Sequence, residues 1–120
     1  MEFNGNSDKK QRIIQEFVPG KQITLAHIIA NPEPALFKKM GVIGEHKGAL
    51  GIMTITPSEG AIIGADVASK SGDVEVIFVD RFNGSLIICG EVADVEASVR
   101  AVIHVLSDNM HFAGVEITKT

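Results

Sequence analysis

The side chains that most often do chemistry are spread along this chain rather than grouped. Four histidines are present: His27, His46, His104 and His111. None of them stands with a second ligand in a familiar metal-binding template. His104 and His111 lie about two turns apart along one side of a predicted helix, and we interpret them as exposed helix residues rather than a shared metal site. Ser58 and Ser85 lack a nucleophile elbow.

The dipeptide Asp80-Arg81 and the single cysteine, Cys89, are the other candidates for chemistry. Neighbouring residues on a strand point to opposite faces, so Asp80 and Arg81 cannot share one pocket directly. We interpret them as members of separate ion pairs at a subunit edge. Cys89 lies in an apolar run, which is typical of an inert buried thiol. The alternative is an Fe–S cluster held by symmetry-related copies of Cys89 on an oligomer axis. We expect no enzymatic activity.

The composition predicts one globular domain. The chain has 120 residues, of which 45% are hydrophobic, and a net charge of −4. A negative charge without basic clusters argues against a nucleic-acid or anionic-membrane partner. One cysteine excludes an internal disulfide, and no apolar run approaches the roughly 20 residues that span a bilayer. We therefore expect a soluble, cytoplasmic protein.

Any site must be positioned by the stretch from Ala49 to Val92, which reads as strand, helix, strand, turn, strand. Leu50 to Ile55 predicts a buried strand. Thr56-Pro57-Ser58-Glu59 has the pattern of a capping box and predicts a helix from Pro57 to about Ser71. This helix has a face of small residues at helical spacing: Gly60, Ala61, Gly64, Ala65, Ala68 and Gly72. The small face indicates close packing, either on the sheet or against another subunit.

A hairpin follows this helix. Val74 to Phe82 and Leu86 to Ile88 are strand-like, and Asn83-Gly84 between them is a strong hairpin signal when both residues take positive φ. The two strands are therefore predicted to be antiparallel neighbours.

The flanking segments complete the predicted order. Residues 1–10 are interpreted as a flexible leader, and Gln11 to Val18 as a strand without a partner in the chain. Lys21 to Ile29 predicts another strand, and Asn31-Pro32 is expected to cap a short helix over Pro32 to Met40.

The C-terminal part predicts a helix capped by Asp94 and then a short strand over Val115 to Thr118. The apolar positions of the helix hold helical spacing: Val95, Val99, Val102, Ile103, Leu106 and Met110. The whole chain is then an α+β domain of the split βαβ, ferredoxin-like kind. Two main helices cover one face of a mainly antiparallel sheet.

Three segments resemble one known family: VPGKQITLAHIIANP (Val18 to Pro32), ALGIMTITPSEGAIIGADVASKSGDVEV (Ala49 to Val76) and FVDRFNGSL (Phe78 to Leu86). They are similar to the circularly permuted hexameric shell proteins of bacterial microcompartments, of the ethanolamine- and propanediol-utilisation type. The resemblance spans residues 11–120, which it implies are a single permuted domain. It implies a non-enzymatic homohexamer without a cofactor that tiles into a microcompartment shell. Its implied partners are other shell proteins and encapsulated enzymes.

The resemblance also implies roles for particular residues. Residues 11–18 would form one strand of a six-stranded axial barrel, and its central residues are Ile13, Ile14, Gln15, Glu16 and Phe17. Lys70 matches a lysine at the edge between hexamers. Asn31 lies in the segment that replaces an arginine-containing edge motif of unpermuted relatives. The turn near the axial pore matches Phe82, Asn83, Gly84 and Ser85. Gly48 is a hypothetical kink that would bend the hexamer.

Two other functions fit the same predicted fold, since fold alone does not choose a function. One is a regulatory oligomer that binds a small molecule near Asp80 and Arg81. The other is a shell protein variant that carries the Fe–S cluster at Cys89.

Overall fold

The centre of the fold is a sheet whose described strands have the order β4-β5-β3-β2-β6. The computed structural model describes residues 20–42 and 48–120. The strand bounds are Gln22–Ile29 (β2), Ala49–Thr56 (β3), Val74–Asp80 (β4), Ser85–Gly90 (β5) and Thr118–Lys119 (β6). All neighbouring pairs are antiparallel except β2 with β6, which is parallel. The prediction of a mainly antiparallel α+β domain is confirmed.

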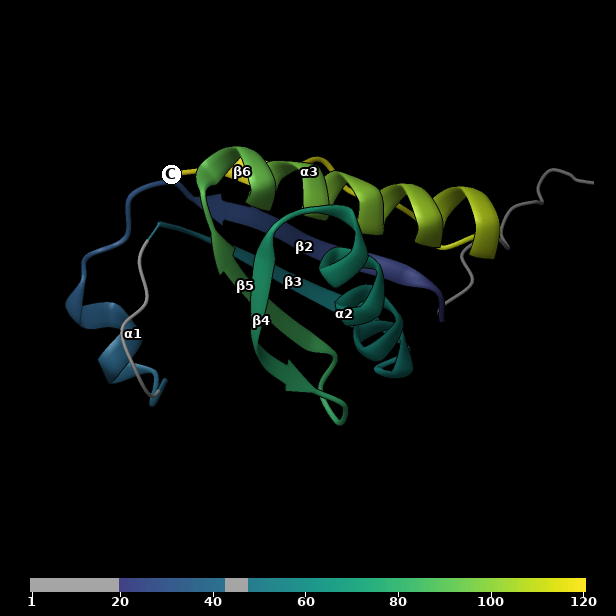
Figure 1. Cartoon of the computed structure of the whole chain (residues 1–120). Coiled ribbons are helices and arrows are strands. Elements are labelled where there is room, and N and C mark those ends of the chain that lie inside the picture. The colour runs from purple at the N-terminus through teal and green to yellow at the C-terminus, as the bar shows by residue number, and fades with distance from the viewer. Residues whose placement is uncertain (1–19, 43–47) are drawn as a thin grey trace, which may run out of the picture.

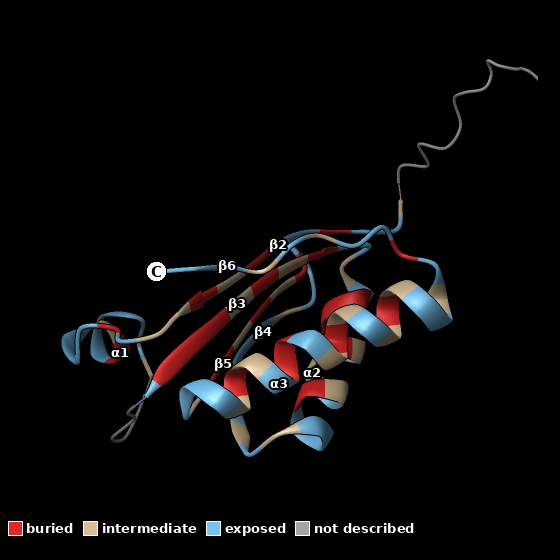
Figure 2. Cartoon of the chain, turned by 90° about the horizontal axis from the view of Figure 1, so that it is seen from above, coloured by how far each residue is buried: buried red, intermediate tan, exposed pale blue. Residues whose placement is uncertain are grey.

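The two long helices lie together on one face of this sheet (Figure 1). They are α2, Glu59–Ser71, and α3, Val92–His104, which continues as a π-helical turn, η1, over Val105–Asn109. The short helix α1, Ala35–Lys39, stands apart from them beyond one end of the sheet, as both views show (Figures 1 and 2).

The main core fills the layer between the sheet and the long helices, where the buried residues of both gather (Figure 2). The helical positions predicted to face it are confirmed for Val95, Val99, Val102 and Leu106, each 0% exposed. The sheet contributes Ile28, Met53, Ile55, Leu86 and Ile88, each at most 2% exposed. Side chains alternate along a strand, so every second residue faces this core. The residues between them face the opposite side of the sheet.

The small face of α2 packs inside the chain. Gly60 and Gly64 are buried, and a Cβ atom on Gly60 would lie 2.4 Å from Ile55 Cγ2. A Cβ atom on Gly72 would lie 2.6 Å from Ser98 Oγ. These distances are shorter than carbon and oxygen atoms tolerate, so the sheet and α3 require the small residues. Of the two predicted causes, packing within the subunit is the one observed.

The opposite face of the sheet holds a second, smaller apolar cluster, made by Phe37, Leu50 and Cys89. Cys89 follows Ile88 of the main core, and neighbouring strand residues point to opposite faces. Helix α1 therefore packs, through Phe37, on the side of the sheet away from α2 and α3.

The predicted starts of both long helices are wrong. Helix α2 begins at Glu59 rather than at Pro57, and no side-chain cap bond is present there. The first amides instead donate to backbone carbonyls, from Gly60 N to Pro57 O and from Ala61 N to Ser58 O. Helix α3 begins at Val92, so Asp94 lies inside the first turn. Its carboxylate accepts a hydrogen bond at 3.4 Å from Asp73 N, which lies in the loop between α2 and β4 rather than in its own helix.

The short elements also differ from the prediction. Helix α1 begins at Ala35, and Asn31 does not cap it. The final strand occupies Thr118–Lys119 instead of Val115 to Thr118, and it pairs there with β2, with Thr118 opposite His27 and Lys119 opposite Ile28.

Candidate functional site

The turn between β4 and β5 is built around the carboxylate of Asp80. Its Oδ1 atom accepts hydrogen bonds from Phe82 N at 2.8 Å and Asn83 N at 3.1 Å. Its Oδ2 atom accepts one from Asn83 Nδ2 at 2.8 Å. These three bonds favour the charged form, and they lower the pKa of Asp80, with the Asn83 side chain as the largest cause. The turn is thus fixed from within.

The conformation of this turn corrects the predicted one. Only Gly84 has positive φ, +80°, and Asn83 does not. The loop therefore takes Arg81 to Gly84 between the paired residues Asp80 and Ser85, which is longer than the two-residue turn that Asn-Gly predicts. Gly84 N donates to Asp80 O, and Gly84 O accepts from Ile55 N at 2.9 Å, which ties the turn to β3.

Two side chains at this turn are oriented outward. Phe82 is 78% exposed, and the Arg81 guanidinium carbon lies 5.0 Å from the centre of its ring. Asp80 is engaged inside the turn while Arg81 stacks on Phe82, so the two do not form a catalytic pair. Neither residue takes part in the ion pairs seen within the described part of the chain, and the ion pairs at a subunit edge stay a prediction.

We expect the Asp80 carboxylate to make stability depend on pH. A group whose pKa is lowered by folding stabilises the folded state above its unfolded pKa, about 3.9 for aspartate, and loses this effect as the pH falls. Asp80→Ala should therefore lower the melting temperature at pH 7, and the difference from the wild type should shrink below about pH 4. Thermal unfolding of both proteins from pH 7 to pH 3 measures this. A difference that does not change with pH would contradict the assignment.

The candidate edge residues lie at the other end of the sheet from this turn. The strand register pairs Ile29 with Leu50 at one end and Gln22 with Thr56 at the other. Asn31 follows Ile29 and is exposed. Lys70 is in the last turn of α2 near the start of β4, and its Nζ atom pairs with Asp66 Oδ2 at 2.8 Å. Both side chains are exposed, so both are accessible to another molecule.

The remaining candidates are Cys89, which is buried, and His27, which is hydrogen-bonded within the chain. Cys89 is 4% exposed, and burial, followed by the charge of Glu75, raises the pKa of its thiol. Both causes oppose the thiolate that an Fe–S cluster needs. The His27 ring hydrogen-bonds with the hydroxyls of Thr118 and Thr120. Within residues 20–42 and 48–120, no three His, Cys, Asp or Glu side chains gather as a metal site would require.

Several predicted residues cannot be placed. The leader, the barrel strand with Ile13 to Phe17, and His46 lie outside the described residues.

The sequence analysis missed an exposed apolar surface on β4, where Phe78 and Val79 are 47% and 37% exposed. The signal was present as three successive apolar residues from Ile77 to Val79, which a one-sided strand would not have.

Comparison with known proteins identifies the family of this chain. A model of the BMC domain matches residues 49–119. The bacterial microcompartment shell protein PduU of Salmonella typhimurium is 51% identical over 109 residues, which cover 91% of this chain and 93% of PduU. This chain belongs to the bacterial microcompartment (BMC) shell proteins. Among them, EutS of Escherichia coli is 50% identical over 92% of this chain and 98% of its own length.

The BMC shell fold is also found in a solved structure. A chain described as a CutR flat hexamer, form 1, superposes with a TM-score of 0.80 at 44% identity, covering 92% of this chain and all of that chain. The match with the BMC model begins at residue 49, so β2 precedes it although β2 lies inside the sheet between β3 and β6. No helix in the described part of this shell protein has the length and apolar character needed to cross a membrane.

Proposed function

We propose that this chain is a structural shell subunit that assembles as hexamers and tiles with other shell proteins around a bacterial microcompartment. The observation that carries this proposal is the likeness to the CutR flat hexamer over 92% of the chain. The curated relatives at about 50% identity are all named as microcompartment shell proteins, which are structural. The chain's activity is then self-association, and encapsulated enzymes are further partners.

The domain is circularly permuted, and residues 11–120 form it. The place of β2 supports this. In the described sheet β2 is a full partner of β3 over Gln22 to Ile29, yet it lies before the span that the BMC model matches. A permutation that moves the last strand of the domain to the front gives this arrangement.

The segment 11–18 supplies one strand of an axial barrel, with Ile13 to Phe17 at its centre, and residues 1–10 form a leader. The position of the first residues of β2 supports this proposal. Gln22 pairs with Thr56, and the neighbouring Ile55 binds the turn through Gly84. The chain therefore enters the sheet beside the turn that the resemblance assigns to the pore. Six such strands would leave no unpaired edge.

The turn over Phe82 to Ser85 faces the axial pore, and Lys70 and Asn31 contact neighbouring hexamers. Their positions at opposite ends of the sheet support this division. A subunit of a sixfold ring needs one end near the axis and the other at the rim. The internal hydrogen bonds of Asp80 hold the turn in one conformation.

The first experiment is the mass of the purified protein in solution at several concentrations, followed by electron microscopy. We expect a hexamer that forms sheets. A monomer at every concentration, or a hexamer that forms no sheets alone or with other shell proteins, would contradict the proposed function.

Lys70→Ala is expected to leave hexamers intact and to weaken their association into sheets. The ion pair of Lys70 with Asp66 is exposed, so losing it costs the fold at most about 0.5 kcal/mol. Asp66→Ala is the matched control, because it removes the same ion pair but keeps the lysine, and it should still form sheets. Sheet formation is measured by electron microscopy and light scattering. Loss of the hexamer in Lys70→Ala would contradict the edge assignment.

A further inference from the structure

The turn between β4 and β5 contains a dipeptide with covalent chemistry of its own, Asn83-Gly84. The same dipeptide occurs once more in the sequence, as Asn4-Gly5. Asparagine is among the thermolabile residues, because its side-chain amide can be lost as ammonia. The loss is easiest before glycine, which has no Cβ atom to hinder attack by its own amide nitrogen. The turn therefore carries a group that can be modified by water alone.

Deamidation of Asn83 takes place in two steps. In the first, Gly84 N attacks Asn83 Cγ, so that a new N–C bond forms and the Cγ–Nδ2 bond breaks. The amide group leaves with the Gly84 proton as ammonia, and a succinimide ring remains. In the second step water adds to one of the two carbonyl carbons of the ring and opens it. The product is aspartate or isoaspartate at position 83, and water is the only co-reactant.

Hydrogen bonds engage both reacting groups in the folded chain. Gly84 N, the nucleophile, donates to Asp80 O at 2.8 Å. Asn83 Nδ2, the leaving group, donates to Asp80 Oδ2 at 2.8 Å, and Asn83 N donates to Asp80 Oδ1 at 3.1 Å. Gly84 O accepts a hydrogen bond from Ile55 N at 2.9 Å. Ring closure needs a close, aligned approach of Gly84 N to Asn83 Cγ, so the bonds to Asp80 must break first.

The Asp80 carboxylate remains a strong acceptor at neutral pH. The bonds that it accepts lower its pKa, with the Asn83 side chain as the largest cause, so it is ionised there. Hydrogen bonds to an ionised group are roughly twice as strong as those between neutral groups. Without this carboxylate we expect the turn to open about tenfold more often.

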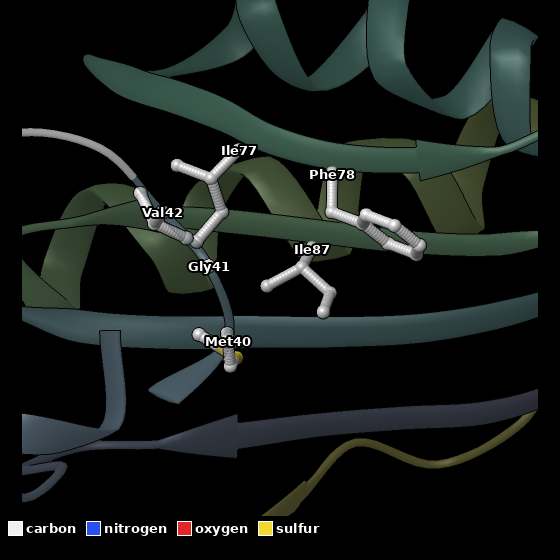
Figure 3. A pocket seen from close by; sticks show the side chains of 6 residues that line it. All are labelled: Met40, Gly41, Val42, Ile77, Phe78 and Ile87. Atoms are coloured by element: carbon white, nitrogen blue, oxygen red, sulfur yellow. The ribbon is translucent and has the colours of Figure 1, made fainter. Parts of the chain in front are cut away.

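Burial does not protect Asn83, because this residue is exposed. Apolar side chains line two hollows beside the turn, and Phe78 belongs to both. One hollow also contains Ile62 and Phe82. The other, of about 360 Å³, also contains Met40 and Ile77 (Figure 3). Asn83 lines neither hollow, so water reaches it and the hydrogen bonds of the turn are left to slow the reaction.

We propose that Asn83-Gly84 is a latent deamidation site that the Asp80 carboxylate keeps unreactive in the folded subunit. The inference does not depend on the proposed function, since every group involved lies within one chain. Deamidation would open the turn that prevents it. It replaces the donor Nδ2 by an acceptor oxygen beside the Asp80 carboxylate, and two adjacent carboxylates repel each other. Isoaspartate would also lengthen the main chain before Gly84, whose carbonyl binds β3.

The test follows deamidation of the full chain at neutral pH by peptide mass mapping. We expect Asn83 in the native wild type to react at least about tenfold more slowly than in the same chain unfolded in urea. Asp80→Ala should remove most of this difference in the native protein. Gly41→Ala is the matched control, because Gly41 has φ of +83° and alanine there destabilises the fold outside the turn. It should leave Asn83 as slow as in the wild type.

Each outcome decides for or against the inference. Equal rates at Asn83 in the native and the unfolded wild type would overturn it. So would a folded Asp80→Ala that reacts as slowly as the wild type, or a Gly41→Ala that reacts as fast as Asp80→Ala. Circular dichroism shows whether the variants are folded during the incubation, and Asn4-Gly5 in the same molecules is the internal reference for temperature and pH.

A second variant decides if Asp80→Ala does not fold. Asp80→Asn keeps the shape of the side chain, but only one of its two terminal atoms can accept hydrogen bonds. It therefore cannot accept from the Asn83 side chain and from the amides of Phe82 and Asn83 together. Faster deamidation of Asn83 in folded Asp80→Asn supports the inference, and an unchanged rate overturns it.

Discussion

Gly84→Ala is expected to lower the free energy of unfolding by about 2–5 kcal/mol. Gly84 has φ of +80°, a region where an L residue costs about 1–2 kcal/mol. Its Cβ atom would also lie 2.1 Å from Ile55 O. That oxygen belongs to the backbone of β3 and cannot rotate away, so the turn and the strand would have to separate. Chemical denaturation followed by circular dichroism measures the loss.

Gly41→Ala is the matched control for this prediction. Gly41 has nearly the same dihedral angle, φ of +83°, but within the described residues no atom outside its immediate chain neighbours would lie within 4 Å of its Cβ. It should lose only the conformational part, about 1–2 kcal/mol. The difference between the two variants is the cost of the contact with Ile55 O. Equal losses would show that Gly84 does not approach β3 as described.

Leu106→Ala is expected to lower the free energy of unfolding by about 2–5 kcal/mol, the range found when a buried leucine is truncated and leaves a cavity. Leu106 is 0% exposed and lies in η1, where α3 continues over the sheet. Its carbonyl also accepts a hydrogen bond from Phe112 N at 2.9 Å, so the turn that ends the helix is attached to this residue. The same denaturation measurement applies.

Leu25→Ala controls for the chemistry of the Leu106 substitution. The same atoms are removed from a side chain that is 39% exposed, so the loss should be about 1 kcal/mol. Both variants must be measured at one protein concentration, because assembly stabilises the folded subunit by mass action. A loss at Leu106 no larger than that at Leu25 would contradict the packing of η1 in the main core.

Local sequence patterns predicted the elements well where one periodicity dominated. The helical spacing of Val95, Val99 and Val102 placed the buried face of α3 correctly, and all three are fully buried. The alternation and turn residues around Asn83 placed the β4–β5 hairpin correctly. In both cases the pattern arises from burial of one face, which constrains many residues at once.

Helix starts and turn geometry were predicted less well, because a capping side chain can choose among several donors. Asp94 has the chemistry of a cap, yet its carboxylate binds Asp73 N across the loop before β4. Asn83-Gly84 has the chemistry of a two-residue turn, yet the Asp80 carboxylate binds Asn83 and fixes a longer one. The energy differences between such alternatives are about 1 kcal/mol each, so neighbouring elements decide them.

The sequence by itself determined the order of the elements, the apolar faces of the helices and the family to which the chain belongs, because each of these is written in many residues of a contiguous stretch. Only the tertiary structure decided why α2 carries small residues, since the atoms that require them belong to Ile55 and Ser98 on other elements. It also decided that Met40, Ile62 and Phe78 form one exposed surface. These residues are far apart along the chain, and only the pairing of the strands and the docking of α2 bring them together.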